Sequence, residues 1–484
     1  MSGVGSKRKK ATEEEAPLPR AGSARKSRRG RGEDVICAQT VSPPAVPGSA
    51  AEVTTTASTI TSVLESSNHH YAPPVLPPAP PAMPSSKQVV KKASAATNTQ
   101  ETEEEKTHLR VNVDELIGRR FQVIKCMGTG TFGKVYQCRD FKHNDIVALK
   151  CIRSVHKYIE SAKVETKILN TIYKLQRDEI ESGTLPREYC VKLYTRVYHG
   201  PHYCMAFEPL GPSLLDVLKS NDFRGLPMSF VHSIAKQLTE ALVFMERIEV
   251  VHTDLKLENI LFVQPTTLTH PMNGYGMEKQ HFFGRGRRAY TDLTPTSYPS
   301  AVWGPYGWPY YNLPLDSSVK LIDFGGANMM PIGHEKTSII NTRQYRGPEV
   351  TLEIGWSFPS DMWSLGCVLA EIWTGGLLFA THENLEHLCL IEKFVGPYPD
   401  WMIRRSPVRR NFFRSDGTLR ADTLDEKSAL KVQSLTTLDA SVYEDAEFVS
   451  LLRRMLEIDP HKRATPSTVG KERFFSKVYP LPFR

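Results

Sequence analysis

The sequence has no long apolar run and no paired cysteines. Its longest apolar runs, such as residues 260–263, are far shorter than the roughly 20 residues that span a bilayer. No hydrophobic segment follows Met1, and the eight cysteines include no C-x-x-C pair of the kind that holds zinc. These absences predict a soluble, non-secreted protein with reduced thiols, without a zinc site, a disulfide framework or a membrane partner.

Residues 1–110 also lack any sustained hydrophobic period. They are rich in Pro, Ala, Ser and Thr, with a proline-rich stretch at 73–84 and an acidic patch at 101–105. Such a composition buries too little apolar surface to fold, so we expect a disordered tail. The net charge of +8 is concentrated there, in residues 7–10 and 25–31. These two basic clusters predict recognition by a nuclear import receptor, with direct contact to nucleic acid as the alternative.

Hydrophobic periodicity begins after the tail and predicts two differently built halves. Residues 121–152 form short β-prone runs separated by glycine, and residues 158–175 carry an apolar stripe at helical spacing. Helical periods dominate later, in residues 230–245, 361–374, 384–395 and 444–457. We therefore expect an α+β fold in which a small sheet with one helix precedes a larger, mainly helical part.

A long insert at residues 264–316 interrupts this pattern. It is rich in Gly, Pro, Tyr and Trp and contains a basic RGRR sequence at 285–288. A structureless segment of this length is uncommon inside a compact domain unless it is functional or mobile. We expect a mobile surface insertion; an aromatic and basic segment that docks a partner or contacts RNA is the alternative.

Three glycines, Gly128, Gly130 and Gly133, lie between two β-prone runs. Without side chains they let backbone N–H groups approach a polyphosphate closely. A plain hairpin or a dinucleotide-binding turn could carry the same spacing, but a strand rather than a helix follows at Val135, which disfavours the dinucleotide reading.

Lys150 ends the apolar run IVALK, and Glu165 interrupts the apolar stripe of the following helix. A lysine at a strand end is usually only solvated. A carboxylate on an apolar face, however, needs a partner, because burying it unpaired costs several kcal/mol. We therefore expect Lys150 and Glu165 to pair and to hold the α- and β-phosphates of a nucleotide.

The octapeptide HTDLKLEN, residues 252–259, forms a polar loop between apolar runs. Asp254 can orient a hydroxyl and accept its proton, Lys256 can neutralise a transferring phosphoryl group, and Asn259 can bind a metal. Asp323 of a later Asp-Phe-Gly sequence supplies a second metal-binding group beside Asn259. Hard oxygen ligands together with substrate phosphates favour Mg²⁺.

Together with Gly347-Pro348-Glu349 and a late Arg463 that can pair with Glu349, these motifs make residues 116–478 resemble the eukaryotic protein kinase domain. The resemblance implies a two-lobed fold with an N-lobe at 116–207, a hinge at 208–211 and a C-lobe at 212–478.

Three segments narrow the resemblance to the LAMMER, or CDC-like, dual-specificity kinases of the CMGC group. They are HTDLK at 252–256, TRQYRGPE at 342–349 and EHLCLIEK at 386–393, which stands before Gly396-Pro397. The segment LCLIEK departs from the family signature, and the family's Arg/Ser-rich tail is missing. In this divergence the chain is similar to the kinetochore-associated member of kinetoplastid protozoa.

The resemblance also implies the nucleotide-binding residues. Phe207 would be the gatekeeper, and Glu208 and Leu210 would present hinge backbone groups to the adenine. The other expected nucleotide-binding residues are Ser213 and Asp216, near the ribose, with Met127, Gly128, Gly130, Gly133, Val135, Ala148 and Lys150.

Thr253 stands where many kinases have an arginine that binds a phosphorylated activation loop. We therefore predict activity without obligatory loop phosphorylation. Glu258 is in a position to meet a substrate arginine, which predicts basic Ser/Thr motifs, although a structural cap is equally compatible. Candidate autophosphorylation sites are Thr337, Ser338, Thr342 and Tyr345.

The predicted function is ATP-dependent phosphorylation of Ser and Thr on proteins, and of Tyr at least on the enzyme itself. We expect a monomeric catalytic domain that is nuclear, with a cytoplasmic pool, and acts on kinetochore or splicing proteins. A pseudokinase scaffold and a nucleic-acid-binding protein that uses the basic tail and aromatic insert are the alternatives.

Overall fold

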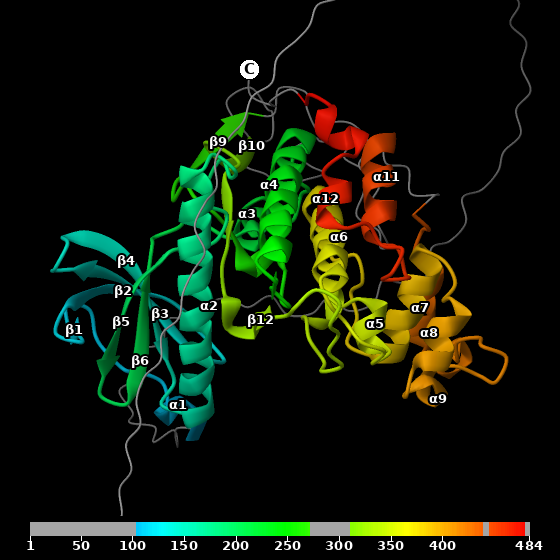
Figure 1. Ribbon diagram of the computed structural model, residues 1–484, viewed down its shortest axis with the longest axis horizontal. Helices are drawn as coiled ribbons and strands as arrows, with labels where there is room; N and C mark the ends of the chain where they lie inside the picture. Colours follow the sequence, from blue (N-terminus) through cyan, green and yellow to red (C-terminus); the bar gives the residue numbers. More distant parts are fainter. Residues whose placement is uncertain (1–102, 272–309, 439–444, 480–484) are drawn as a thin grey trace, which may run out of the picture. The chain divides into compact units, whose positions relative to one another are not determined.

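Alternating buried and exposed side chains build the amino-terminal sheet (Figure 1). In β4 the side chains of Val147, Leu149 and Cys151 are buried, as expected for a strand with one face on the core. The sheet has six antiparallel strands in the order β1-β2-β3-β4-β6-β5. Their bounds are β1 Leu116–Ile117, β2 Phe121–Gly130, β3 Gly133–Asp140, β4 Asp145–Ile152, β5 Leu193–His199 and β6 His202–Phe207.

The computed structural model describes residues 103–271, 310–438 and 445–479, all within the unit Ala95–Arg484. Helix α2 (His156–Glu181) packs against the sheet and is longer than its predicted stripe. Ala162, Leu169 and Ile172 are buried on its apolar side, and Glu165 is buried among them. This small lobe with one long helix confirms the predicted α+β arrangement.

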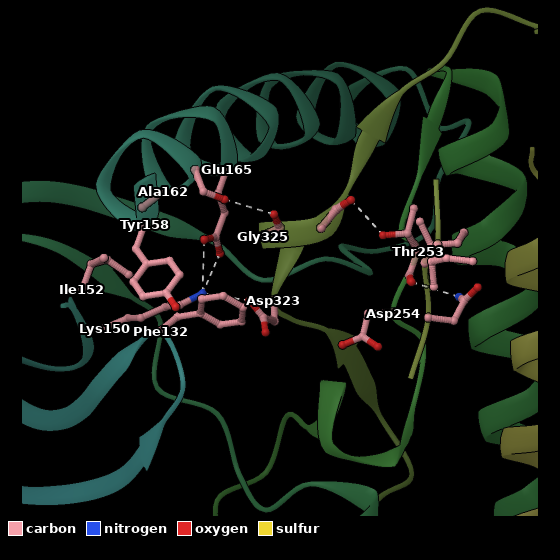
Figure 2. A pocket seen from close by; sticks show the side chains of 15 residues that line it. Phe132, Lys150, Ile152, Tyr158, Ala162, Glu165, Thr253, Asp254, Asp323 and Gly325 are labelled. Atoms are coloured by element: carbon pink, nitrogen blue, oxygen red, sulfur yellow. Dashed lines mark hydrogen bonds and ion pairs between the residues drawn. The ribbon is translucent and has the colours of Figure 1, made fainter. Parts of the chain in front are cut away.

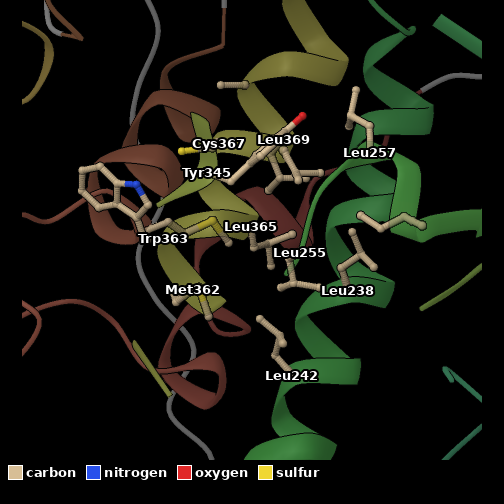
Figure 3. Packing of buried hydrophobic residues seen from close by; sticks show 14 of the residues in the cluster. Leu238, Leu242, Leu255, Leu257, Tyr345, Met362, Trp363, Leu365, Cys367 and Leu369 are labelled. Atoms are coloured by element: carbon tan, nitrogen blue, oxygen red, sulfur yellow. The ribbon is translucent and has the colours of Figure 1, made fainter. Parts of the chain in front are cut away.

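Two helices form the centre of the larger lobe. Every residue from Ser360 to Thr374 in α6 (Pro359–Thr374) is buried, as expected for a helix surrounded by other elements. Figure 3 shows Leu238 and Leu242 of α4 (Met228–Arg247) beside side chains of α6, with Leu255 close to both. Because Leu255 directly follows Asp254, the core of this lobe anchors the loop that carries the predicted chemistry.

The remaining helices surround this centre (Figure 1). They are α3 Leu214–Ser220, α5 Pro348–Thr351, α7 Asn384–Phe394, α8 Asp400–Arg405, α9 Arg409–Phe412, α10 Glu426–Ser434, α11 Ala446–Met455 and α12 Pro466–Val469. Among the described residues, no helix is both long and apolar enough to cross a membrane.

Short two-stranded ladders connect the loops of the site. β7 (Val250–Val251) pairs with β12 (Asn328–Met329), and β8 (Ile260–Phe262) pairs with β11 (Val319–Leu321). The loop 252–259 connects β7 to β8, and Asp323 follows β11. Pairing of β8 with β11 therefore brings the two predicted catalytic segments together although a long insert separates them in sequence.

The predicted end of the tail at residue 110 is wrong. Residues 103–110 are described and include α1 (Glu103–Lys106). Leu109 is 5% exposed within the sheet's core, and Tyr136 donates a hydrogen bond of 3.0 Å to the Leu109 carbonyl oxygen. The burial of Leu109 and this hydrogen bond attach the segment to the sheet. The basic clusters at 7–10 and 25–31 lie outside the described residues.

The ends of the 264–316 insert are ordered, which corrects the expectation of a structureless segment. β9 (Thr267–Pro271) and β10 (Tyr310–Pro314) form an antiparallel ladder, and Leu313 is fully buried. Asn221 fixes this ladder, because its amide donates to the Asn312 carbonyl oxygen at 2.9 Å and its carbonyl accepts from the Asn312 backbone N–H at 2.8 Å. The predicted aromatic and basic features at 272–309 lie outside the described residues.

Candidate active site

The glycine-rich hairpin joins β2 to β3 and covers one side of the site. A β-carbon on Gly128 or Gly130 would meet nothing within 4 Å, so the space beside them is open. A β-carbon on Gly133 would instead overlap the Cys151 carbonyl oxygen. The third glycine is therefore required by close packing on β4, whereas the backbone beside the first two is open.

The predicted nucleotide-binding residues of the sheet share one face. Val135 lies opposite Lys150, and Ala148 lies opposite Phe207, in the antiparallel register. Because directly opposed side chains point to the same face of a sheet, and residues two apart on a strand do as well, these side chains line one surface. Gly128 also belongs here, because it is paired with Val135.

Lys150 connects the sheet, the long helix and the Asp-Phe-Gly segment (Figure 2). Its Nζ donates to Glu165 Oε1 at 3.0 Å and Oε2 at 3.1 Å, and to Asp323 Oδ1 at 2.8 Å. Burial disfavours the ammonium ion, but the two carboxylates outweigh burial and raise the pKa of Lys150 above its ordinary value. The lysine is therefore a permanent cation between two carboxylates.

Asp254 is held by contacts on both of its carboxylate oxygens. Lys256 Nζ donates to Oδ2 at 2.7 Å, while the Thr342 hydroxyl and backbone N–H donate to Oδ1 at 2.8 Å and 3.1 Å. Burial opposes ionisation of Asp254, but the bonds from Lys256 and Thr342 prevail and hold its pKa below the ordinary value. Asp254 is thus an oriented carboxylate next to a cation. Nothing in the sequence indicated that Thr342 would lie beside Asp254.

Asn259 completes this group. Its Nδ2 donates to the Asp254 carbonyl oxygen at 2.9 Å and to Asp254 Oδ2 at 3.2 Å. No hydrogen bond occupies its amide oxygen among the residues that the structure describes, so this oxygen can bind a metal. For Asp323, burial is the largest effect and opposes ionisation, but the charge of Lys150 lowers the pKa below its ordinary value.

Asp361 of α6 holds the start of the loop 252–259 in place. Its carboxylate accepts the backbone N–H groups of His252 at 2.6 Å and Thr253 at 2.9 Å. The sequence predicted Asp361 only as the start of a helix, because its partners precede it by more than a hundred residues. Glu349 and Arg463 form the predicted buried ion pair, with contacts of 2.7 Å and 2.9 Å.

The hinge region contains an ion cluster that the sequence did not indicate. Lys320 Nζ donates to Glu208 at 2.7 Å and 2.9 Å and to Glu188 at 2.9 Å. The Glu208 side chain therefore faces Lys320, three residues before Asp323, while its backbone lies in the predicted hinge. Leu210 is half-buried at the end of this segment.

Ser213 and Asp216 make contacts that their predicted position near a ribose did not suggest. The Asp216 backbone N–H donates to Ser213 Oγ at 3.1 Å, and Ser213 donates to Asp216 Oδ2 from its N–H at 3.1 Å and its hydroxyl at 2.7 Å. This is a capping box at the start of α3. Met127 is 52% exposed on the glycine-rich hairpin.

The candidate autophosphorylation sites fall into different environments. Thr337 and Ser338 are exposed. Tyr345 is 5% exposed, and its hydroxyl donates to Glu371 Oε2 at 2.6 Å. The prediction of Tyr345 as an autophosphorylation site is therefore wrong for this structure, because the hydroxyl is not accessible. The Thr342 hydroxyl is bound to Asp254 and also accepts from Lys256 Nζ at 3.1 Å.

A cavity of about 360 Å³ lies between the lobes (Figure 2), and of the predicted nucleotide-binding residues only Lys150 lines it. Lys150, Glu165, Asp254 and Asp323 all line it, together with Phe132 of the glycine-rich turn. A cavity of this size with convergent charged groups is typical of a ligand site.

Comparisons with known proteins agree with this geometry. The protein kinase domain model matches residues 121–280 and 310–475. Serine/threonine-protein kinase AFC1 of Arabidopsis thaliana is 34% identical over 385 residues, which cover 78% of this chain and 75% of the relative. Dual specificity protein kinase CLK2 of Homo sapiens is also 34% identical, over 78% of this chain and 68% of the relative.

A crystal structure of a kinase domain is similar as well. It has a TM-score of 0.64 and 31% sequence identity, and the match covers 77% of this chain and 99% of that one. Members of this family use ATP and a divalent metal ion and act on protein substrates. The chain belongs to the AFC, CLK and LAMMER group of dual-specificity CMGC protein kinases and catalyses ATP-dependent protein phosphorylation.

Proposed function

We propose that this kinase phosphorylates Ser and Thr in basic motifs without a phosphorylated activation loop. The observation that carries the proposal is the position of Asp254 between Lys256 and Thr342. A carboxylate whose two oxygens are both held by donors is oriented before a substrate binds, which is what proton abstraction from a hydroxyl requires.

The proposed roles follow from the contacts. Asp254 orients the acceptor hydroxyl and takes its proton, and Lys256 balances charge on the transferring phosphoryl group. The Thr342 hydroxyl donates to one oxygen of Asp254, as the hydroxyl of a substrate Ser or Thr would, and holds the carboxylate in place. Lys150 is fixed by Glu165 and holds the phosphates of the nucleotide.

The metal site is proposed at Asp323 and Asn259. An ionised carboxylate and an amide oxygen that no described residue binds form an oxygen donor set that suits Mg²⁺, so the residues fit the ion. When bound, Mg²⁺ would neutralise the phosphate charge. The chain's own contribution is to hold Asp323 through Lys150 and Asn259 through its bonds to Asp254.

The pseudokinase alternative is disfavoured by the same contacts. Loss of catalysis usually removes a member of the set Lys150, Glu165, Asp254, Asn259 and Asp323, whereas here all are present and line or border one cavity. The nucleic-acid-binding alternative depends on residues 1–102 and 272–309, which lie outside the described part of the chain.

For the substrate, we propose protein segments with an arginine near the acceptor Ser or Thr. Glu258 supports this preference because its side chain is exposed beside the catalytic loop, with no hydrogen bond or ion pair to any described residue. The basic clusters of the tail support a nuclear location through an import receptor, with a cytoplasmic pool. Kinetochore and splicing proteins are the proposed substrates of a monomeric catalytic domain, and tyrosine is the proposed acceptor in autophosphorylation.

The test uses the full-length protein and peptide arrays with labelled ATP and Mg²⁺. We expect incorporation into Ser/Thr peptides that rises with an arginine near the acceptor, and a D254N variant with no more than residual activity. Equal incorporation with and without arginine would contradict the substrate proposal, and a wild-type protein no more active than D254N would favour the pseudokinase.

A further inference from the structure

The turn of the glycine-rich hairpin is attached to the rest of the small lobe by Arg153. The strand pairing of β2 and β3 ends at Gly130 and Gly133, so it does not hold the turn residues Thr131 and Phe132. Arg153 Nη1 donates to the Thr131 carbonyl oxygen at 3.0 Å, and the Arg153 backbone N–H donates to the Phe132 carbonyl oxygen at 3.0 Å. Both bonds come from the residue that directly follows β4.

Arg153 is itself held by the segment that precedes the residues matched by the protein kinase model. It is 6% exposed, and a buried guanidinium requires acceptors in fixed positions. Its Nε donates to the Thr107 hydroxyl at 2.8 Å. The Thr107 carbonyl oxygen accepts the Ser154 backbone N–H at 2.9 Å, so Thr107 is fixed from two sides.

Leu109 attaches the segment that contains Thr107 to the sheet. Its side chain lies in the core of the sheet, and its carbonyl oxygen accepts from the Tyr136 hydroxyl. The match to the protein kinase model begins only at residue 121. The residues that support Arg153 therefore stand outside the region that the family model covers.

The same contacts reach the helix that carries Glu165. The Phe132 and Tyr158 rings meet edge to face with centroids 5.4 Å apart, and the Arg153 guanidinium lies 5.4 Å from the Tyr158 ring centroid. Figure 2 shows Phe132 and Tyr158 side by side next to Lys150. One arginine thus connects the glycine-rich turn, the start of α2 and residue Thr107.

We propose that Arg153, held by Thr107, is a positioning residue that fixes the glycine-rich turn over the nucleotide, and that the segment 107–109 is a functional part of the ATP site. This inference rests on the proposed role of the glycine-rich hairpin in phosphate binding. The proposed effect is on the entropy of binding. A mobile turn loses conformational freedom when the nucleotide binds, whereas a turn that is already held in place loses less.

The test measures the affinity of the full-length protein for ATP with Mg²⁺ by calorimetry, and separately KM for ATP and kcat. Arg153→Met keeps the apolar stem and removes the guanidinium donors, while the backbone N–H that binds the Phe132 carbonyl oxygen stays; Thr107→Val removes only the hydroxyl. We expect R153M to weaken ATP binding and raise its KM by about tenfold, with kcat at saturating ATP within about twofold, and T107V to have roughly a threefold effect. R139M, an exposed arginine of β3, and T171V, an exposed threonine of α2, serve as matched controls without effect.

A double variant makes the test specific. If Thr107 acts through Arg153, T107V adds nothing in the R153M background, because the bond that it removes is already absent. Wild-type ATP affinity in T107V, or a full additional effect of T107V in R153M, would overturn the inference. If R153M does not fold, the same measurements on R153K and T107V test the inference, because lysine and valine still fill the buried positions. Because affinity is measured without phosphoryl transfer, a failure here is distinct from a failure of the catalytic roles.

Discussion

The Thr253 hydroxyl donates a hydrogen bond of 2.8 Å to the Gly326 carbonyl oxygen. In turn, the Thr253 carbonyl oxygen accepts the Asn341 backbone N–H at 3.0 Å and its side-chain amide at 2.9 Å. Thr253 has φ of 69°, which is unusual for a β-branched residue and is sustained by these bonds and by Asp361. The residue before Asp254 therefore holds Gly326 and Asn341, on either side of residues 327–340, without a phosphate.

From this contact we predict activity that is independent of loop phosphorylation. Phosphatase treatment is expected to leave turnover within about threefold of the untreated enzyme, since no charge-assisted clamp is needed. Turnover on a basic Ser/Thr peptide before and after treatment, with phosphate content followed by mass spectrometry, checks this. A loss of more than about tenfold would contradict the prediction.

The Thr253 hydroxyl itself is open to a direct test. Thr253→Val removes the bond to Gly326 at nearly constant volume, and we expect kcat/KM to fall by about 3- to 10-fold, in line with the net value of one hydrogen bond. Thr253→Ser keeps the hydroxyl and is the matched control. Equal kinetics for the valine and serine variants would show that the hydroxyl has no role in activity.

Asp254→Asn should remove proton transfer while keeping the side chain's shape. We expect kcat to fall by roughly 10²- to 10⁴-fold with little change in KM for ATP, because Asp254 contacts Lys256 and Thr342 rather than the glycine-rich hairpin. Asp145→Asn, at an exposed position in β4, controls for the change of charge. A fall of less than tenfold would count against Asp254 as the base.

The Arg463–Glu349 pair is predicted to determine stability rather than chemistry. Both side chains are almost fully buried, at 0% and 1% exposed. Arg463→Met leaves Glu349 without this partner, so we expect a loss of about 3–5 kcal/mol in the free energy of unfolding. The exposed pair of Arg405 and Glu335 offers the control, because R405M should cost less than about 1 kcal/mol by chemical denaturation.

Glu371 predicts a specific pH dependence of stability. Burial raises its pKa from 4.5 to about 7, although the Tyr345 hydroxyl acts in the opposite direction. Between these values the folded state keeps a proton that the unfolded state releases, so the free energy of unfolding falls as the pH rises from 4.5 to about 7 and then levels off. Above that window the ionised carboxylate is buried at a cost on the order of 3 kcal/mol.

Glu371→Gln removes this titration and keeps an acceptor for Tyr345. As the pH rises from 5 to 8, the free energy of unfolding of the variant should therefore increase relative to that of the wild type, as measured by denaturant unfolding. Tyr345→Phe removes the hydroxyl that lowers the pKa and should extend the upper end of the window to higher pH. A constant difference between E371Q and the wild type across this range would refute the assignment.

The sequence alone determined the chemical groups of the site and the family. Gly128, Lys150, Asp254 and Asp323 stand in short motifs whose spacing follows from strand and loop geometry, and the apolar stripe around Glu165 required a cation. The two-lobed α+β fold followed from periodicity, because alternation and helical spacing depend only on local geometry.

Only the tertiary structure decided how these groups are held. Thr342 reaches Asp254 across 88 residues, Asp361 reaches Thr253 across 108, and Arg153 reaches Thr107 across 46. The packing of the helical core around α6 and of Leu109 in the sheet brings these partners together. Hydrogen bonds between distant segments leave no periodic pattern in the sequence. In addition, a residue such as Asp216 can either cap a helix, as it does here, or line a site, and the neighbours that the fold brings to it determine which.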